Sequence, residues 1–386
     1  MMKRILLRVA VVAALLAIAA LGVAGWHYSE LILGPDGPPE KHGQAILART
    51  DSTITLARTP KAERPGRWAI EWSDGYGELG ETIARDSERV IRRFRLAAGP
   101  PPGTTARLAG FAFDADPGTW LGMAFDTVRV PASVGPLAAW LLPGADSTWA
   151  IFVHGRGATR AEVLRMLPAY RAAGLPCLVI TYRNDAGAPQ VDGGRYRLGD
   201  TEWRDLEDAV RFARARGARD VVLVGCSMGG GIIAQFLRRS PLASECRAAV
   251  LDAPALDWNA VLALAARQRR VPAWLTEVGK WIAGLRGGWQ WSDLVQAEHA
   301  SEFHTPMLIL HGDGDETVPI DVSRRFAAAR PDLVTFAVFP AAGHVESSNF
   351  DATRYRRVVG EWLAAHAIGA EPPALTAAAA VRGARR

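Results

Sequence analysis

From about residue 149 onward, short apolar runs alternate with helix-like segments. Runs such as "WAIFV", "CLVI", "VVLVG" and "PMLIL" consist entirely of apolar residues and glycine or proline, which is typical of strands buried on both faces. The intervening segments carry apolar residues at helical spacing, for example Trp203, Leu206 and Val210 before a stop at Gly217. This alternation predicts an α/β fold with a mostly parallel central sheet covered by helices on both faces.

One block interrupts the alternation. Residues 256–300 lie between two expected strands, and their spacing indicates helices rather than strands. We therefore expect a helical lid inserted into the sheet domain. The block is rich in tryptophan, which is more typical of a packed lid core than of a ligand box, although two or three indoles could face an acyl or aromatic substrate. The tryptophans are Trp258, Trp274, Trp281, Trp289 and Trp291.

The region before the alternation is expected to be rich in strands. "AILARTDSTITLAR" and "RWAIEWSDGYGELG" indicate strands joined by polar or glycine turns, whereas "DSERVIRRFRLAAGPPPG" fits a strand or a short helix equally well. "TVRVPASVGPLAAWLLPG" indicates a hairpin. The expected organisation is an N-terminal segment (1–29), a β-rich region that opens with the linker "GPDGPPE" (30–125), an α/β domain (126–368) and a disordered Ala-, Pro- and Arg-rich tail (369–386).

The N-terminal segment has the composition of a membrane helix. Lys3, Arg4 and Arg8 precede an uncharged apolar run from Val9 to Trp26, close to the roughly 18–20 residues that a span needs. The run is longer than the usual ~7–15 apolar residues of a signal peptide, but Gly22-Val23-Ala24 also fits a cleavage site. We expect a single-pass membrane protein with its α/β domain outside the cytoplasm, or else a protein secreted after signal cleavage.

Composition excludes several other classes of function. The net charge of +5 comes from basic residues scattered among acidic ones, which indicates a solvated surface and no nucleic-acid partner. Three cysteines without a CxxC pair do not form a disulfide framework, and no HExxH motif is present. The sequence therefore predicts no metal and no cofactor.

The stretch "VVLVGCSMGGG" carries the strongest chemical signal. Within it, residues 225–229 (GCSMG) match G-x-S-x-G after an apolar strand and before a helix, which is the context of a nucleophile elbow. The sharp turn exposes the central residue, so Ser227 is the expected nucleophile, and its neighbour Cys226 is expected to point back into the fold. A phosphate loop does not fit, because no lysine follows the glycines.

A serine hydroxyl needs a base, which an acid orients. His344 follows the expected strand "VTFAVFP", and Asp313 and Asp315 follow the strand "PMLIL". The order Ser…Asp…His is that of α/β-hydrolases, and the carboxyl ends of parallel strands share one sheet edge. Asp315 is the preferred acid, with Asp313 and Asp252, which ends "VLD", as alternatives. In this fold the amides of Met228 and Arg156 are the expected oxyanion donors. We interpret the Arg156 side chain as a solvated loop arginine, with binding of a carboxylate or phosphate as the alternative.

Residues 149–365 resemble the α/β-hydrolase superfamily, in its serine esterase and prolyl-oligopeptidase-like branch. The motifs that carry the resemblance are "VHGRG", "GCSMGGG", "LILHGDGDETVP" and "AAGHVE". The resemblance implies that the acid is the second aspartate of "HGDGD", Asp315. The segment "TYRN" departs from the family's glycine-rich turn, because Asn184-Asp185-Ala186 stands where glycines are expected.

The expected function is hydrolysis of carboxylic esters through an acyl-enzyme. In this scheme Ser227 attacks, His344 takes its proton and Asp315 orients the imidazole, and the substrate is a small-molecule or lipid ester. A serine peptidase or an acyltransferase of the same fold is an alternative, although about 115 residues of β-like sequence are too few for a typical propeller of about 4–8 blades. A binding protein that keeps an inactive hydrolase fold is a further alternative.

Overall fold

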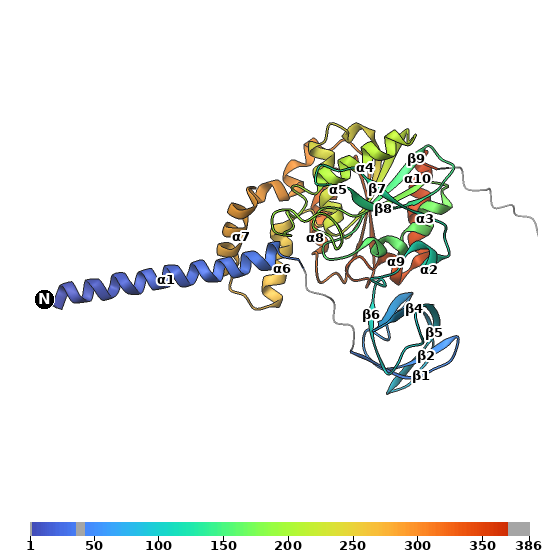
Figure 1. Ribbon diagram of the computed structural model, residues 1–386, viewed down its shortest axis with the longest axis horizontal. Coiled ribbons are helices and arrows are strands. Elements are labelled where there is room, and N and C mark those ends of the chain that lie inside the picture. Colours follow the sequence, from blue (N-terminus) through green and yellow to red (C-terminus); the bar gives the residue numbers. More distant parts are fainter. Residues whose placement is uncertain (1, 36–42, 370–386) are drawn as a thin grey trace, which may run out of the picture.

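The computed structural model describes residues 2–35 and 43–369. Along the chain, the long helix α1 (Met2–Leu33) is followed by a small barrel and a larger α/β body (Figure 1). By length and composition, α1 could cross a membrane, and a signal sequence would have the same properties. The expected tail lies outside the described residues from residue 370 onward, as does the linker over residues 36–42.

The barrel is closed by six strands that pair antiparallel in the order β1-β2-β5-β4-β3-β6. The segment that fits a strand or a helix equally well by sequence forms β5. Alternate residues fill the interior, and Ile54 and Leu56 of β2 are fully buried. The expected β-rich extension is thus confirmed. The strands are β1 (Gln44–Arg49), β2 (Thr53–Ala57), β3 (Trp68–Trp72), β4 (Gly75–Arg85), β5 (Arg89–Ala98) and β6 (Thr105–Ala109).

The α/β body is built on an eight-stranded sheet in the order β14-β13-β12-β11-β9-β10-β8-β7. Its neighbours pair in parallel except for β8 with β10 and for the expected hairpin β7–β8 at one edge. A mostly parallel sheet is therefore confirmed. The strands are β7 (Asp126–Val130), β8 (Leu137–Leu142), β9 (Thr148–Val153), β10 (Cys177–Ile180), β11 (Asp220–Cys226), β12 (Cys246–Asp252), β13 (Met307–Gly312) and β14 (Val334–Phe339).

Helices cover both faces of this sheet, and β11 shows why its sequence is continuously apolar. Leu223 belongs to one buried cluster with residues of α4, α5 and α8, whereas Val222 and Val224 belong to a second cluster with residues of α3 and α10. The helices are α2 (Pro117–Leu121), α3 (Leu167–Ala172), α4 (Trp203–Ala215), α5 (Met228–Arg239), α8 (Ile320–Ala329), α9 (Ser347–Phe350) and α10 (Ala352–Ala365).

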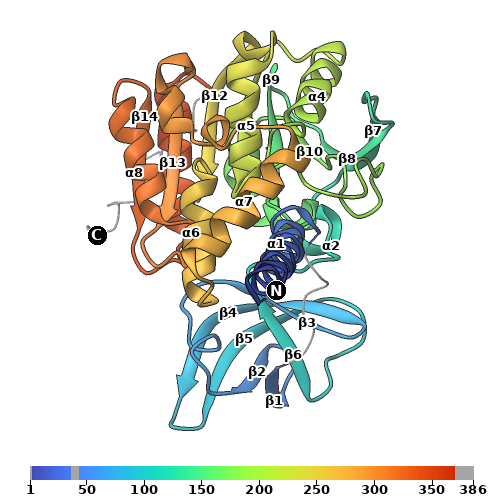
Figure 2. The same cartoon turned by 90° about the vertical axis from the view of Figure 1, so that its left-hand side faces the viewer.

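The predicted helical insertion is also confirmed. Between β12 and β13 the chain forms α6 (Trp258–Gln268) and α7 (Ala273–Gly287), followed by two short 3₁₀ segments, Trp291–Leu294 and Gln296–Glu302. Figure 2 shows α1, α6 and α7 grouped together in front of the sheet, with the barrel below them. The insertion and the C-terminal end of α1 therefore share one side of the body.

The barrel contacts the body beside the loop that carries His344. Arg64 forms a 2.6 Å ion pair with Glu346, which follows His344 by two residues. The Arg67 amide donates to the carbonyl of Asn349 at 2.8 Å, and the Asn349 side-chain amide donates back to the carbonyl of Arg67 at 2.7 Å. The barrel is thus attached to the start of α9, immediately after the expected base.

Candidate active site

Ser227 lies at a sharp turn between β11 and α5. Its φ of 52° and ψ of −121° are uncommon for a residue with a side chain, as expected for a strained functional turn. Backbone hydrogen bonds hold it there. The Ser227 amide donates to the carbonyl of Asp252 at 3.1 Å, and its own carbonyl accepts from the amides of Gly230 at 3.0 Å and Ala255 at 2.9 Å. The turn is therefore fixed to the last residue of β12 and to the segment that follows this strand.

The glycines around Ser227 are required by space. A Cβ at Gly229 would lie 2.2 Å from the carbonyl oxygen of Val153, and a Cβ at Gly225 would lie 2.8 Å from the carbonyl oxygen of Gly229. Both distances are shorter than atoms can approach, so the positions two residues before and after the serine admit only hydrogen. At the next glycine, Gly230, a Cβ would lie 2.5 Å from Cβ of Pro254, so a side chain has no space there either.

His344 and Asp315 meet at the carboxyl edge of the sheet. The Nδ1–H of His344 donates to Oδ2 of Asp315 at 2.7 Å, which leaves Nε2 of the imidazole free to act as a base. The other carboxylate oxygen, Oδ1, accepts from the backbone amides of Thr317 at 2.7 Å and Val318 at 2.9 Å. Because each oxygen has its own donors, the orientation of the carboxylate is fixed.

A second histidine, His311, contacts the same carboxylate and was not predicted. Its Nε2 lies 3.1 Å from Oδ2 of Asp315 and 3.1 Å from the carbonyl of Val318, both acceptors, so Nε2 carries the proton and Nδ1 accepts from the Ser323 hydroxyl at 2.8 Å. Burial alone would raise the pKa of Asp315, but the hydrogen bonds from His311 and His344 outweigh burial and hold that pKa below its ordinary value. A histidine ending an apolar strand, "LILHG", was the available sequence signal.

The two alternative acids have other partners. Oδ1 of Asp313 accepts from the amide of Ala341 at 2.6 Å. Asp252 is buried beneath the turn, where its Oδ1 accepts from the Ser347 hydroxyl at 2.9 Å. Burial raises the pKa of Asp252 to about 6. Among the described residues, Asp315 is the carboxylate that is hydrogen-bonded to His344.

Ser227 and His344 line one cavity of about 440 Å³. No hydrogen bond joins the two side chains within the described part of the chain. Arg156 lies on the same wall, in the loop that follows β9. A Cβ on the preceding residue, Gly155, would come within 3.1 Å of Cβ of Ser227, so this loop passes directly beside the serine.

The two amides expected to bind an oxyanion belong to Met228, directly after Ser227, and to Arg156, which is among the cavity residues. Met228 is the first residue of α5, and the amides of a first helical turn have no partner within their own helix. The partial positive charge of the helix N-terminus also favours negative charge at this point. The backbone of Arg156 lies in the loop that passes beside Ser227. The two amides stay the predicted oxyanion donors.

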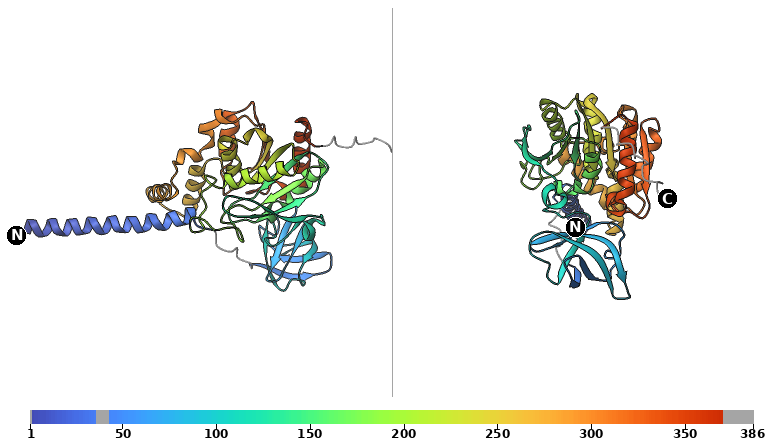
Figure 3. Two further views of the ribbon diagram at one scale, coloured as in Figure 1. Left: turned by 45° about the horizontal axis from the view of Figure 1, so that its top comes forward. Right: turned by 90° about the vertical axis from the view of Figure 1, so that its right-hand side faces the viewer.

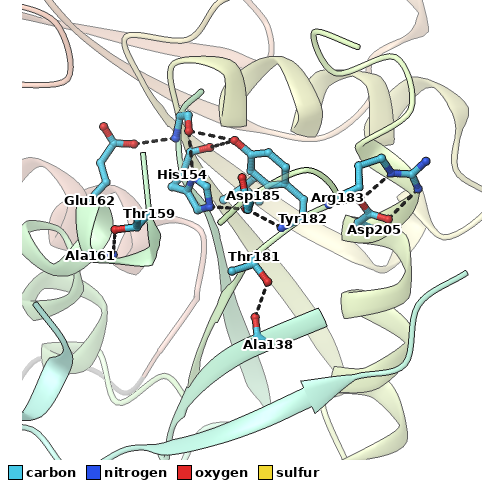
Figure 4. Close-up of polar contacts among 12 residues, drawn as sticks. Ala138, His154, Thr159, Ala161, Glu162, Thr181, Tyr182, Arg183, Asp185 and Asp205 are labelled. Carbon is cyan, nitrogen blue, oxygen red and sulfur yellow. Dashed lines mark hydrogen bonds and ion pairs between the residues drawn. The ribbon is translucent and has the colours of Figure 1, made fainter. Parts of the chain in front are cut away.

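A buried polar network supports that loop from behind (Figure 4). His154 contacts Asp185 through Nε2 at 2.9 Å and lies flat against the ring of Tyr182, 4.6 Å between centroids. The Tyr182 hydroxyl donates to the carbonyl of Gly155 at 2.9 Å, and the Gly155 amide donates to Glu162 at 2.6 Å. The Asp185 that replaces the family's glycine-rich turn is therefore the partner of His154, a role that the sequence analysis missed.

Cys226 points away from the cavity into the body. It is fully buried, and its Sγ lies 3.2 Å from Oε2 of Glu162. Burial raises the pKa of the Cys226 thiol well above its ordinary value. A thiol that stays protonated and inaccessible cannot serve as the nucleophile.

The interpretation of the Arg156 side chain was wrong, whereas that of the tryptophans as a packed lid core holds for Trp258 and Trp289, which are buried. The Arg156 side chain is not a solvated loop group, because its guanidinium donates to the carbonyls of Gly34 at 2.6 Å and Leu31 at 3.3 Å at the end of α1. Of the five tryptophans in the insertion, Trp258 alone is among the described residues that line the cavity. Trp274 and Trp281 are instead 58% and 65% exposed. The helical spacing of the tryptophans could not show which of them line the cavity and which are exposed, because it carries no information on where α1 packs.

The described residues include no group of three or more His, Cys, Asp or Glu side chains placed to hold a metal ion. At the cavity the structure brings together a strained serine and an imidazole that is oriented by an ionised carboxylate. These are the parts of a nucleophilic acyl-transfer site.

Comparisons with known proteins agree with this fold. A model of the alpha/beta hydrolase family matches residues 150–361, and a model of a domain of unknown function, DUF8805, matches residues 45–109, which form the barrel. The Pyrococcus furiosus esterase Pf2001 is similar in two crystal forms. In space group P212121 the identity is 18% and the TM-score 0.54, with 66% of this chain and 94% of that chain covered.

In space group P21 the identity is 18% and the TM-score 0.53, with 65% of this chain and 96% of that chain covered. Such a likeness shows a shared fold. A search of curated proteins found no match. Since the family match covers more than half of the 386 residues, the chain belongs to the alpha/beta hydrolase family.

Proposed function

We propose that this protein is a serine hydrolase that cleaves carboxylic esters through an acyl-enzyme on Ser227. The observation that carries the proposal is the convergence of the strained Ser227 and the Asp315-bound His344 on one cavity. Each of the three residues follows a different strand, so the fold itself brings them together. The roles below are those that their geometry supports best.

In the first half-reaction Ser227 Oγ attacks the ester carbonyl while Nε2 of His344 takes the hydroxyl proton. The imidazolium that forms is stabilised by Asp315, which already accepts from Nδ1. Negative charge on the carbonyl oxygen is accepted by the amides of Met228 and Arg156, and loss of one such donor typically costs about 10²–10³-fold in rate. His344 then returns the proton to the alkoxide, the C–O bond breaks and the alcohol leaves.

In the second half-reaction a water molecule gives its proton to His344 and attacks the acyl carbonyl. The tetrahedral intermediate collapses, the Ser227 oxygen leaves with the proton from His344, and the carboxylic acid is released. His311 takes no proton in this scheme. It acts as a positioning residue, because its hydrogen bond to Asp315 helps to keep that carboxylate ionised and oriented.

We further propose that α1 is a retained anchor and that the catalytic domain lies outside the cytoplasm. Lys3, Arg4 and Arg8 lie at the N-terminal end of the apolar run, which favours keeping that end on the cytoplasmic side. The most apolar part of α1 is not buried against any other described part of the chain. The proposed division of the chain is α1 with its linker, the barrel, and the hydrolase domain with its α6–α7 insertion.

The test of the hydrolase proposal is turnover of p-nitrophenyl butyrate by detergent-solubilised full-length protein. We expect a burst of p-nitrophenol that matches the enzyme concentration, and one butyryl group on the peptide containing Ser227 after acid quenching. Ser227→Ala abolishes both. A variant that still turns over the ester at the wild-type rate would contradict the proposal. With added methanol, the ratio of methyl butyrate to butyric acid among the products measures acyl transfer relative to hydrolysis.

A further inference from the structure

The C-terminal end of α1 packs tightly across α7. A Cβ on Gly25 of α1 would lie 2.5 Å from Cδ1 of Ile282 and 2.7 Å from Cγ1 of Val278. In the reverse direction, a Cβ on Gly279 of α7 would lie 2.8 Å from Cβ of Tyr28. Each helix therefore offers a glycine at the crossing, which lets the two backbones approach closely.

Ion pairs fix the rotation of α1 at this crossing. Glu30 accepts from Arg195 at 2.9 Å and from Arg286 at 2.6 Å, and Arg286 also contacts the Ser29 hydroxyl. One turn further on, the carbonyl of Leu33 accepts a hydrogen bond from the backbone amide of Tyr196 at 2.9 Å. The end of α1 is thus part of the hydrolase body, and its faces keep a fixed orientation toward the cavity.

The crossing lies where the apolar run of α1 ends. Val9 to Trp26 is free of charge and, at about 1.5 Å per residue, measures about 27 Å, close to the roughly 30 Å of a bilayer core. If the run spans a membrane, Gly25 places α7 at the level of the membrane surface. In Figures 1 and 3, α7 lies at the end of the body from which α1 projects.

At that level α7 presents large apolar side chains to the outside. Trp274, Trp281 and Leu285 are 58%, 65% and 65% exposed. They are seven and four residues apart, so at about 100° per residue they lie on one side of the helix. Trp26 of α1 adds a fourth exposed apolar group at 53%. Indole rings gather at membrane surfaces, where one edge of the ring is apolar and the other is wet.

The cavity that holds Ser227 is walled by the same elements. Tyr28, Leu31 and Ile32 of α1 line one side, and Trp258, Val261 and Leu262 of α6 line another. Ile32 is seven residues past Gly25, so at about 1.5 Å per residue the cavity lies within roughly 10 Å of the proposed membrane surface. The helix that would leave the bilayer therefore also forms a wall of the cavity that holds the serine.

We propose that this cavity takes the acyl chain of an ester that resides in the adjoining bilayer, with α7 seated on the membrane and α1 forming a wall of the site. The proposal rests on the proposed function, because it names the substrate class for the same serine. It predicts that the exposed face of α7 matters only when the ester is held in a membrane.

The test uses full-length protein in vesicles of palmitoyl-oleoyl phosphatidylcholine and phosphatidylglycerol at a 3:1 ratio. The substrates are 4-methylumbelliferyl oleate, which partitions into the vesicles, and 4-methylumbelliferyl butyrate, which is soluble and has the same leaving group. The variant is Trp274→Ser with Trp281→Ser. The matched control is Leu47→Ser with Ile83→Ser, which removes apolar groups that are 55% and 47% exposed on the barrel.

We expect the α7 variant to lose roughly tenfold in oleate hydrolysis, which corresponds to about 1.4 kcal/mol, while its butyrate rate and that of the barrel variant stay within twofold of wild type. Equal oleate rates for the α7 and barrel variants would overturn the inference, as would a wild-type preference for butyrate in vesicles. If neither ester is hydrolysed, the proposed function has failed instead. Unchanged butyrate hydrolysis shows that the α7 variant is folded.

Discussion

Replacing Asp315 by asparagine should invert the hydrogen bonding of His344. Oδ1 of Asp315 accepts from two backbone amides, so the oxygen of an asparagine must occupy that side. The NH2 group then takes the place of Oδ2, where it faces Nδ1 of His344 and the N–H of His311. His344 can accept from this group only if its proton moves to Nε2, and an imidazole protonated at Nε2 cannot take the proton of Ser227.

The expected loss is about 10⁴-fold in kcat, the effect known for this change in a serine protease, which corresponds to about 5.4 kcal/mol. Asp252→Asn provides the matched control, since its Oδ1 accepts from Ser347 and its Oδ2 has no partner among the described residues. The oxygen of an asparagine at position 252 can keep the hydrogen bond from Ser347, so we expect the kcat of Asp252→Asn to stay within threefold of wild type.

The assay is kcat and KM for p-nitrophenyl butyrate at pH 8, with circular dichroism to show that both variants are folded. A folded Asp315→Asn protein within tenfold of the wild-type kcat would refute the reasoning. So would an Asp252→Asn protein that loses a thousandfold, because it would identify Asp252 as the partner of the base.

Three further predictions concern stability and reactivity. Gly229→Ala should leave little folded protein on expression, because its Cβ would lie 2.2 Å from a carbonyl oxygen. Gly360→Ala, with open space in α10, should instead raise the free energy of unfolding by about 1 kcal/mol in urea titrations. Equal stabilities of the two variants would contradict the steric account. Burial raises the pKa of Asp252 to about 6, so between about pH 4 and 6 the folded state binds more protons than the unfolded state. The free energy of unfolding should therefore fall with rising pH in this range, by up to about 3 kcal/mol, and Asp252→Asn should remove the fall. A variant whose pH profile of unfolding matches that of the wild type would contradict this assignment. Cys226 should resist iodoacetamide at pH 8 until urea unfolds the chain, because the thiol is buried and burial raises its pKa. Alkylation of Cys226 in the native protein, detected by mass spectrometry, would disprove the prediction.

The parts of the fold that sequence could predict are those that rest on local patterns. Continuous apolar strands such as β11 indicate a two-sided parallel sheet, and a glycine two residues on either side of Ser227 indicates a tight turn. Because the carboxyl ends of parallel strands share one edge, Ser227, Asp315 and His344 were expected together, and the structure places them at one cavity or in contact with it. Their catalytic roles stay predictions.

What sequence could not predict depends on contacts between distant segments. Asp185 follows a strand and resembles a solvated turn residue, yet it lies 2.9 Å from His154 because β10 is next to β9. The Arg156 side chain donates to the carbonyl of Gly34, next to the end of α1 and 122 residues earlier in the chain. The closed barrel likewise requires β1 to pair with β6, which no local pattern specifies.

The central claim is that Ser227 is the nucleophile. The most direct measurement is covalent labelling of the full-length protein by a fluorophosphonate probe, followed by mass spectrometry of the modified peptide. We predict labelling on Ser227 in the wild type and in Cys226→Ala, and none in Ser227→Ala. Labelling that persists in Ser227→Ala and disappears in Cys226→Ala would contradict the account.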